Sequence, residues 1–183
     1  NLEKLANHKG SFLGENPGGQ PSQKNFESYL VKSLIKCKNK KCIIMEGESR
    51  KIGKIHLNSN FYNLMKKGRK IWIELPIEVR AERLALEYNR PIEYLISRIN
   101  LLNRYISKDL LNEIIESLNS GDKLKASFLL LQNHYDPIYR NYSPGVSKER
   151  KYCLVLNTEI DINHVFQKLK DFIEKELNCA ETF

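Results

Sequence analysis

Apolar residues recur at helical spacing along much of the chain. In residues 23–37 they include Phe26, Leu30 and Leu34, and Ser22 precedes them as a predicted N-cap. The pair Asp136 and Pro137 predicts a further helix start. The same periodicity predicts helices at about 58–68, 77–88, 91–105, 107–118, 122–134 and 161–178.

Three short runs rich in apolar and β-branched residues predict buried strands: residues 40–46 (KKCIIME), 69–76 (RKIWIELP) and 150–157 (RKYCLVLN). Because predicted helices separate these runs, the connections should cross over and make neighbouring strands parallel. The fold class is therefore α/β. We expect one domain over residues 1–183, with a helical insertion at about 77–142.

The stretch from residue 10 to residue 25, GSFLGENPGGQPSQKN, breaks both periodicities. It holds four of the nine glycines and two of the six prolines, and these residues interrupt regular structure. We predict a long irregular loop, and loops of this length are usually functional or disordered.

The composition is that of a soluble globular protein with a basic surface. Of the 183 residues, 41% are hydrophobic and 28% are charged, and the formal net charge is +8. No apolar run approaches the roughly 20 residues of a bilayer span, and no signal peptide is recognisable, so we expect no membrane partner and a cytoplasmic location. The positive charge favours a polyanionic partner, although compositional drift alone makes many Lys-rich proteins basic.

The cysteines and histidines show no metal-site spacing. The four cysteines form no C-x-x-C pair, which argues against zinc and against a disulfide framework. His8, Lys9 and Ser11 stand just ahead of the glycine-rich loop, where a cation and backbone amides could bind an anion. A lone histidine is more often structural than catalytic, so both interpretations of His8 stay open.

Charged residues follow directly after the predicted strand 40–46. Ligands of an open parallel sheet bind beyond the carboxyl ends of its strands, so Glu46, Glu48 and Arg50 are candidates for a catalytic site. An acid at such a position can hold Mg²⁺, and a guanidinium can bind a phosphate through two hydrogen bonds. The alternative is that both acids are solvated or paired with Arg50.

Two further groups of charged and aromatic residues lie beyond the second predicted strand. Arg80 and Arg83 are one helical turn apart and could close over a phosphate, or neighbouring glutamates of the same helix could pair with both. The stretch NHYDPIYRNY alternates aromatic and cationic residues, which suits stacking on unpaired bases. It equally suits a helix that holds the insertion on the core.

Five strings, in this order, resemble the P-loop domain of the tRNA 2-selenouridine synthase family: LEKLANHKGSFLG, QPSQKNFE, MEGESRKIGKIHL, IELPIEVRAERL and HYDPIYR. The resemblance spans residues 2 to about 140. It implies a P-loop NTPase-like parallel sheet with flanking helices. The partners that it implies are tRNA and a rhodanese-like domain with a catalytic cysteine, on the same chain or a separate one.

The resemblance implies a transferase that modifies the wobble uridine of tRNA. Geranyl diphosphate would first alkylate the sulfur of 2-thiouridine, and selenophosphate would then replace the geranylthio group to leave 2-selenouridine. Alkylation makes chemical sense, because it turns a poor leaving group into a good one. Both compounds are co-substrates in this scheme.

The candidate residues take their roles from the same resemblance. Glu46, Glu48 and Arg50 would be catalytic, with Mg²⁺ on Glu46. The substrate-binding set would be His8, Lys9, Ser11, Gln20, Ser22, Gln23, Arg80, Arg83, Tyr135, Asp136, Tyr139 and Arg140.

The chain departs from the family pattern at its front. No G-x-x-x-x-G-K-[ST] motif occurs in it, so we expect the first strand, the Walker A loop and the rhodanese-like domain to lie outside this chain. The isolated chain is then expected to be inactive. Two alternatives stay open: a P-loop small-molecule kinase, supported by Arg80 and Arg83, and a non-catalytic tRNA-binding module of a split enzyme.

Overall fold

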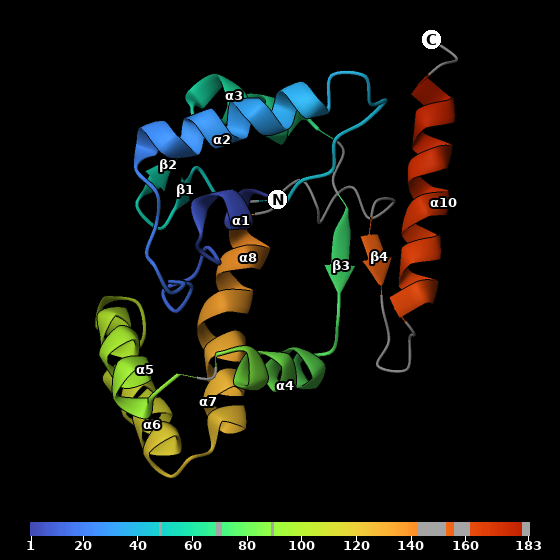
Figure 1. The fold of residues 1–183 in the computed structure, drawn as a ribbon. Coiled ribbons are helices and arrows are strands. Elements are labelled where there is room, and N and C mark those ends of the chain that lie inside the picture. The colour runs from blue at the N-terminus through green and yellow to red at the C-terminus, as the bar shows by residue number, and fades with distance from the viewer. Residues whose placement is uncertain (48, 69–70, 89, 143–152, 156–161, 181–183) are drawn as a thin grey trace. The chain divides into compact units, whose positions relative to one another are not determined.

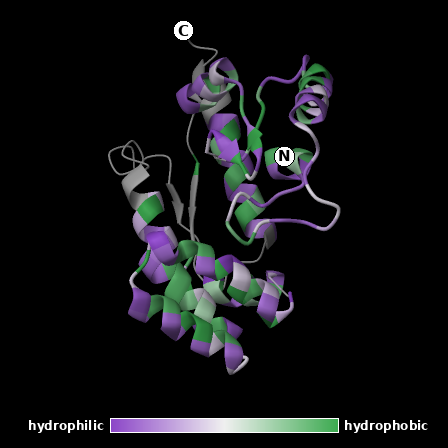
Figure 2. Ribbon diagram, turned by 90° about the vertical axis from the view of Figure 1, so that its left-hand side faces the viewer, coloured by the Kyte–Doolittle hydropathy of each residue, from purple (hydrophilic) through white to green (hydrophobic). Residues whose placement is uncertain are grey.

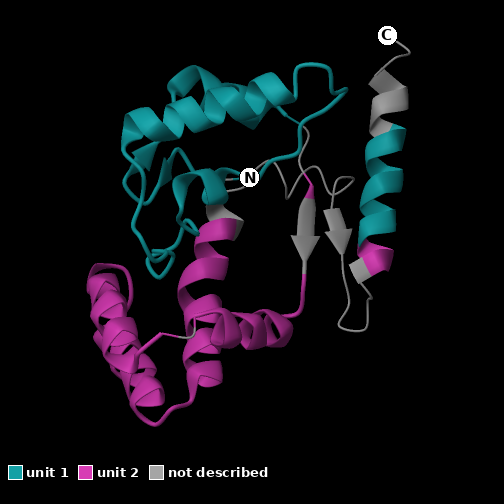
Figure 3. Cartoon of the chain, viewed as in Figure 1, with its two compact units in different colours: residues 1–69, 166–183 teal, residues 70–165 magenta. Residues whose placement is uncertain are grey.

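The computed structural model describes residues 1–47, 49–68, 71–88, 90–142, 153–155 and 162–180. The chain divides into two compact units (Figure 3). Unit 1 comprises residues 1–69 and 166–183, and unit 2 comprises residues 70–165. This division does not decide whether the units belong to one domain, so the single domain expected from the sequence stays a prediction.

Unit 1 is built from helices around a small β-hairpin (Figure 1). The helix α1 (Leu2–Ala6) is followed by irregular chain up to α2 (Gln23–Lys36), which confirms the predicted loop and the predicted helix. The strands β1 (Lys51–Ile52) and β2 (Ile55–His56) pair antiparallel, and α3 (Ser59–Lys67) follows them. The hairpin was not predicted.

A cluster of buried apolar side chains joins α1, α2 and the hairpin. Phe26 of α2 is 1% exposed and Ile52 of β1 is 0% exposed. Burying a side chain of this size stabilises a fold by about 1.5–3 kcal/mol. The cluster consists of Leu2, Ala6, Phe26, Ile52, Ile55 and Leu57. It brings the loop after α1 next to the hairpin, and this contact positions the candidate site of unit 1.

The strand predicted at residues 40–46 is wrong. These residues form no strand in the structure, and Ile43 and Ile44 are 45% and 61% exposed. A β-branched run is stable as a strand when neighbours take its backbone hydrogen bonds and cover its side chains. No described strand does this for residues 40–46. The β-structure of unit 1 lies further along, where Gly53 has a φ of 58° and permits the turn between β1 and β2.

Unit 2 contains a pair of parallel strands. The strand β3 (Trp72–Glu74) pairs with β4 (Cys153–Val155), with Trp72 opposite Cys153. Both lie within runs that were predicted as strands, and their parallel direction agrees with the predicted crossover. Among the described residues the pair does not extend to the broader sheet that the sequence predicted, so the fold is a mostly helical α/β arrangement.

Helices make up most of unit 2, and hydrophobic residues gather where they pack together (Figure 2). The predicted helices are confirmed with small shifts at their ends, except that the helix predicted at 91–105 tightens into a 3₁₀-helix at Asn100. The elements are α4 (Ile77–Glu87), α5 (Ile92–Ile99), η1 (Asn100–Arg104), α6 (Lys108–Asn119), α7 (Lys123–Leu130), η2 (Leu131–Tyr135), α8 (Asp136–Tyr142) and α10 (Ile162–Ala180), which continues into unit 1. In the part of the chain that the structure describes, no helix has the length and apolar character to span a bilayer.

Candidate functional site

The candidate catalytic residues lie in the segment that leads into the β-hairpin of unit 1. The Glu46 carboxylate accepts a hydrogen bond from the Leu2 N–H at 2.8 Å through Oε2. Its other oxygen, Oε1, is buried and has no hydrogen-bond partner among the described residues. The exposed Arg50 side chain donates through Nη2 to the Ser59 hydroxyl at 2.8 Å. Glu48 lies outside the described residues.

The Oε1 atom of Glu46 has features that suit a cation. A buried carboxylate oxygen without a donor is unfavourable, and a hard oxygen ligand is what Mg²⁺ prefers. In the ranges that the structure describes, no three His, Cys, Asp or Glu side chains gather as a ligand set. Mg²⁺ commonly binds through one or two carboxylates and completes its shell with water and phosphate oxygens, so Glu46 alone is compatible with it.

Two glutamines predicted to bind substrate pair with the backbone of the hairpin. The Gln20 amide donates to the Ile52 carbonyl at 2.9 Å and accepts from the Lys54 N–H at 2.6 Å. The Gln23 amide donates to the His56 carbonyl at 2.8 Å and accepts from its N–H at 2.9 Å. Each amide satisfies backbone groups that the two-residue strands leave open. These contacts give both glutamines a structural role, and their contact with substrate stays a prediction.

His8 packs against the turn of the hairpin. The side chain is 6% exposed, and Nδ1 accepts a hydrogen bond from the Gly10 N–H at 3.1 Å. A Cβ at Gly53 would overlap the Gln20 amide and lie 2.6 Å from Cδ2 of His8. His8 therefore closes the space over Gly53, which supports the structural interpretation of this histidine.

Backbone hydrogen bonds hold the chain near Lys9 and Ser11 in place. The Lys9 N–H donates to the Gly14 carbonyl at 2.8 Å, and the Ser11 N–H donates to the Lys9 carbonyl at 2.9 Å. Ser22 accepts a hydrogen bond from the Asn25 N–H at 3.2 Å and begins α2, which confirms it as the N-cap. The Ser22 hydroxyl therefore accepts a backbone hydrogen bond at the first turn of α2.

Asn7 is a positioning residue that sequence reasoning did not identify. It ends α1 in the left-handed conformation, with a φ of 48°. Its side-chain amide donates to the Pro17 carbonyl at 3.1 Å and to the Gly19 carbonyl at 2.7 Å. The usable signal was its residue type, because asparagine tolerates this conformation better than most residues and often follows the last turn of a helix.

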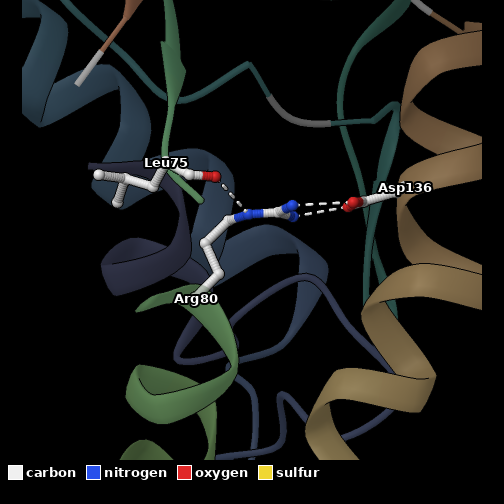
Figure 4. Close-up of polar contacts among 3 residues, drawn as sticks. All are labelled: Leu75, Arg80 and Asp136. Atoms are coloured by element: carbon white, nitrogen blue, oxygen red, sulfur yellow. Dashed lines mark hydrogen bonds and ion pairs between the residues drawn. The ribbon is translucent and has the colours of Figure 1, made fainter. Parts of the chain in front are cut away.

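Arg80 and Asp136 form a two-pronged ion pair within unit 2 (Figure 4). Nη1 and Nη2 of Arg80 lie 2.6 Å and 2.8 Å from the two carboxylate oxygens, and Nε donates to the Leu75 carbonyl at 3.0 Å. Both side chains are mostly buried, at 31% and 19% exposed. The guanidinium joins the end of β3, α4 and α8. The carboxylate of this pair comes from α8, a distant position in the sequence that neither alternative had offered.

A π-helical turn places Asp136 and His134. Residues Leu131–Tyr135 wind as a π-helix, and the Asp136 N–H bonds to the Leu131 carbonyl, five residues earlier. Pro137 lacks an N–H, and its ring would clash with a carbonyl four residues earlier in a regular α-helix. The wider turn accommodates this ring and continues the helix into α8. Such π-turns occur often at functional sites.

His134 lies buried beside two tyrosines. The side chain is 5% exposed, and its ring lies 6.2 Å from the Tyr105 ring and 5.0 Å from the Tyr135 ring. Burial lowers the pKa of His134 below the ordinary value of 6.5, because the charged form is poorly solvated there.

The remaining candidates of unit 2 belong to α4, η2 and α8. Tyr139 is 57% exposed, Tyr135 is half-buried, and Arg83 is exposed without an ion pair to any described residue. Arg140 belongs to α8, but its side chain lies outside the described part. Arg80 and Arg83 therefore do not act as an equivalent pair, since Asp136 holds only Arg80.

The structure thus assigns the candidates to two groups. His8, Gln20 and Arg50, with their sequence neighbours, surround the hairpin of unit 1, and Arg80 and Asp136 centre the group in unit 2. The first group combines an unpartnered carboxylate oxygen with an exposed guanidinium. The fold and these charged groups define the class, namely a mostly helical α/β protein with a carboxylate and a guanidinium beside a small hairpin.

The comparisons with known proteins identify the family. The family described as the tRNA 2-selenouridine synthase AAA domain matches residues 1–120. The match covers all of the candidate residues around the hairpin and also Arg80. The chain belongs to this family.

Relatives with the printed name tRNA 2-selenouridine synthase match over most of the chain. The Shewanella oneidensis protein is 28% identical over 169 residues, which cover 75% of this chain and 45% of the relative. The Hydrogenovibrio crunogenus protein is 24% identical over 199 residues, covering 96% and 52%. The Alcanivorax borkumensis protein is 37% identical over 128 residues, covering 69% and 32%. The chain spans about half the length of the first two. No solved structure matches it significantly.

Proposed function

We propose that this chain is part of a transferase that converts 2-thiouridine to 2-selenouridine at the wobble position of tRNA. The observation that carries the proposal is the match of the tRNA 2-selenouridine synthase AAA domain family to residues 1–120. An AAA domain is a P-loop domain, so we also propose a P-loop NTPase-like fold for the complete protein. The proposed partners are tRNA and a rhodanese-like domain, and the proposed location is the cytoplasm.

The proposed reaction has two steps. The sulfur of 2-thiouridine attacks the first carbon of geranyl diphosphate, and diphosphate leaves. The selenium of selenophosphate then attacks the base carbon, and the geranylthio group leaves as geranylthiol. Water cleaves the remaining P–Se bond, which releases phosphate and leaves 2-selenouridine. Diphosphate and selenophosphate are both phosphate-type anions, so both steps need cationic or metal groups in one pocket.

Glu46 and Arg50 are the residues proposed to meet these anions. The Oε1 atom of Glu46 lacks a hydrogen-bond donor and is free to bind Mg²⁺, which would neutralise phosphate oxygens. The exposed guanidinium of Arg50 can bind a phosphate while one of its nitrogens contacts Ser59. Glu48 is proposed as a third catalytic group from its place in the motif.

In this proposal only part of the substrate-binding set contacts the substrates, and the rest supports the site. Lys9, Ser11, Arg83, Tyr135, Tyr139 and Arg140 are proposed to contact the substrates because the family resemblance implies it. Gln20, Gln23, Ser22, His8, Arg80 and Asp136 are proposed to hold the site in shape, since their polar groups already bind described residues. The kinase alternative depended on a strand, Pro76 and a helix with Arg80 and Arg83, and the pairing of Arg80 with Asp136 weakens only its arginine part.

The function is tested by mass spectrometry of tRNA in a reaction with the complete enzyme, thiolated tRNA, geranyl diphosphate and selenophosphate. We expect 2-selenouridine with the unaltered enzyme, and loss of modification with unchanged tRNA binding for Arg50→Ala. Lys51→Ala is the matched control, because it removes a neighbouring exposed cation. Absence of 2-selenouridine from the unaltered enzyme would overturn the proposed function. Normal modification by Arg50→Ala would overturn the role of that residue.

The role of Glu46 is tested without turnover. Mn²⁺ can replace Mg²⁺ as a paramagnetic probe, and its free concentration can be measured by electron paramagnetic resonance. We expect Glu46→Gln to weaken Mn²⁺ binding, because the neutral amide is a poorer ligand, while Glu15→Gln leaves binding unchanged. Equal affinity of both variants would exclude Glu46 as a metal ligand. Full turnover after charge reversal at Glu46 and Glu48 would instead favour the non-catalytic tRNA-binding module.

A further inference from the structure

The net positive charge of the chain is carried by one of its two units. Unit 2 contains 13 Lys and Arg residues and 13 Asp and Glu residues, so its formal charge is zero. Unit 1 contains 17 Lys and Arg residues and nine Asp and Glu residues, so it carries the whole net charge of +8. Compositional drift should make both units basic. The asymmetry indicates a surface on unit 1 for a polyanion.

The charge of unit 1 is concentrated around the end of α2. Residues 28–45 contain five lysines and no acidic residue. Lys32 and Lys36 lie one turn apart on α2, and Lys38, Lys40 and Lys41 belong to the chain that follows it (Figure 1). All five residues are exposed. We name these five residues the lysine segment.

Ion pairs with described residues do not account for Lys36, Lys38 and Lys40. Lys36 lies in the last turn of α2, where a cation stabilises the helix dipole, but Lys38 and Lys40 lie beyond the helix. Among the described residues, neither Lys36, Lys38 nor Lys40 forms an ion pair. Lysines elsewhere do form them, as in the pair of Lys125 with Glu113, 3.1 Å apart. No described acidic side chain therefore offsets the repulsion among Lys36, Lys38 and Lys40, and a bound polyanion would relieve it.

An aromatic side chain extends the same surface. Tyr29 is 44% exposed and lies three residues before Lys32, so both side chains share one face of α2. Exposed aromatic residues beside lysines suit nucleic acid, where the ring stacks on a base or ribose and the ammonium groups bind phosphates.

We propose that the lysine segment binds the phosphate backbone of tRNA and holds it on unit 1. This inference rests on the proposed function for the identity of the polyanion. Contacts of this kind fix the position and register of a nucleic acid and carry no sequence information themselves. The lysine segment therefore supplies affinity, and the recognition of the wobble base belongs to other residues.

The proposal is tested by fluorescence anisotropy with labelled thiolated tRNA and the 183-residue chain, over a series of salt concentrations. The variant Lys36→Gln/Lys38→Gln/Lys40→Gln should weaken binding at least about tenfold near 0.15 M salt and lower the slope of log K against log salt by about 2 to 3, because each phosphate contact contributes about 0.7–0.9. The control Lys108→Gln/Lys168→Gln/Lys170→Gln removes equal charge from exposed positions elsewhere. It should change the Kd less than about twofold. Equal losses in both variants, or no loss in the first, would overturn the proposal.

A second measurement requires no variant. Cys42 is an exposed free thiol next to Lys41, so bound tRNA should slow its alkylation by N-ethylmaleimide several-fold, as followed by mass spectrometry. An unchanged rate at saturating tRNA would contradict the proposal. Slowing by anionic phospholipid vesicles but not by tRNA would assign the surface to a membrane instead. If tRNA protects Cys42 while the complete enzyme makes no 2-selenouridine, the proposed function fails and the tRNA-binding surface remains.

Discussion

Gly53 occupies a left-handed backbone conformation that alanine and most other residue types adopt only with strain. Its φ is 58°, and an added Cβ would overlap the Gln20 amide. We expect Gly53→Ala to lower the free energy of unfolding by about 1–3 kcal/mol, as measured by chemical denaturation. Gly47→Ala is the matched control, because a Cβ there meets no atom within 4 Å. Equal stability of the two variants would contradict this role of Gly53.

The ion pair of Arg80 with Asp136 should stabilise unit 2 through strong coupling. Hydrogen bonds to charged groups contribute about 1.5–3 kcal/mol, so Arg80→Gln and Asp136→Asn should each destabilise by about 2 kcal/mol. The double variant should lose much less than the sum, because either single change already breaks the pair. Arg83→Gln is the control and should cost little. Additive losses in the double-mutant cycle would show that the pair contributes no coupling energy.

His134 should make the stability of unit 2 depend on pH. Burial lowers its pKa in the folded state below the value of 6.5 that it has in the unfolded chain. On acidification, His134 is therefore protonated at a higher pH in the unfolded chain than in the folded chain. The stability of unit 2 is then greatest above pH 6.5 and falls as the pH drops from 6.5 through the folded pKa. Denaturation at several pH values should show a smaller loss for His134→Gln than for the unaltered chain. His164→Gln, at an exposed position of α10, should retain the full loss.

The sequence predicted which candidate residues group together, but not which groups their side chains bind. The resemblance put His8, Gln20, Ser22 and Gln23 in one substrate-binding set, and His8, Gln20 and Gln23 do lie against the same hairpin. Their hydrogen bonds go to backbone groups of residues that are distant in sequence, such as Lys54 for Gln20. No local pattern predicts these partners, because the fold brings them together.

At the level of elements, α2 offers a direct test of helix capping. The Ser22 hydroxyl accepts from the Asn25 N–H at the first turn, and loss of such a cap costs about 1 kcal/mol. We expect Ser22→Ala to lower the free energy of unfolding by that amount. The measurement is chemical denaturation followed by the helical circular dichroism signal. Ser33→Ala, inside the same helix, is the control and should be neutral or slightly stabilising, since alanine is the better helix former. A larger loss for Ser33→Ala would contradict the cap.

Helices were predicted more accurately than strands. The pattern of Phe26, Leu30 and Leu34 is read within one segment, and the backbone hydrogen bonds of a helix are satisfied inside that segment. Residues 40–46 have strand composition, but a strand takes its hydrogen bonds from a neighbour. The π-turn before Asp136 was likewise not predicted, although Pro137 correctly indicated a new helical segment there.

A substitution in one unit should destabilise that unit and leave the other unchanged. Gly53 and its contacts belong to unit 1, and Arg80 and its contacts belong to unit 2. By hydrogen exchange with mass spectrometry, Gly53→Ala should accelerate exchange in residues 1–68, and Arg80→Gln should accelerate it in residues 77–135, because each change removes contacts within its own unit. Acceleration across both ranges by either variant would show that the units unfold together.

At the level of the whole molecule, the sequence by itself determined the helices, the family and the basic character. Each depends on local periodicity, on short distinctive strings or on composition. The tertiary structure decided that β-pairing in unit 1 lies in a hairpin and that Asp136 holds Arg80. It also showed that the side-chain amides of Gln20 and Gln23 bind backbone groups of the hairpin. The physical reason is that hydrogen-bond partners and burial are properties of distant segments brought into contact, which no single stretch of sequence contains.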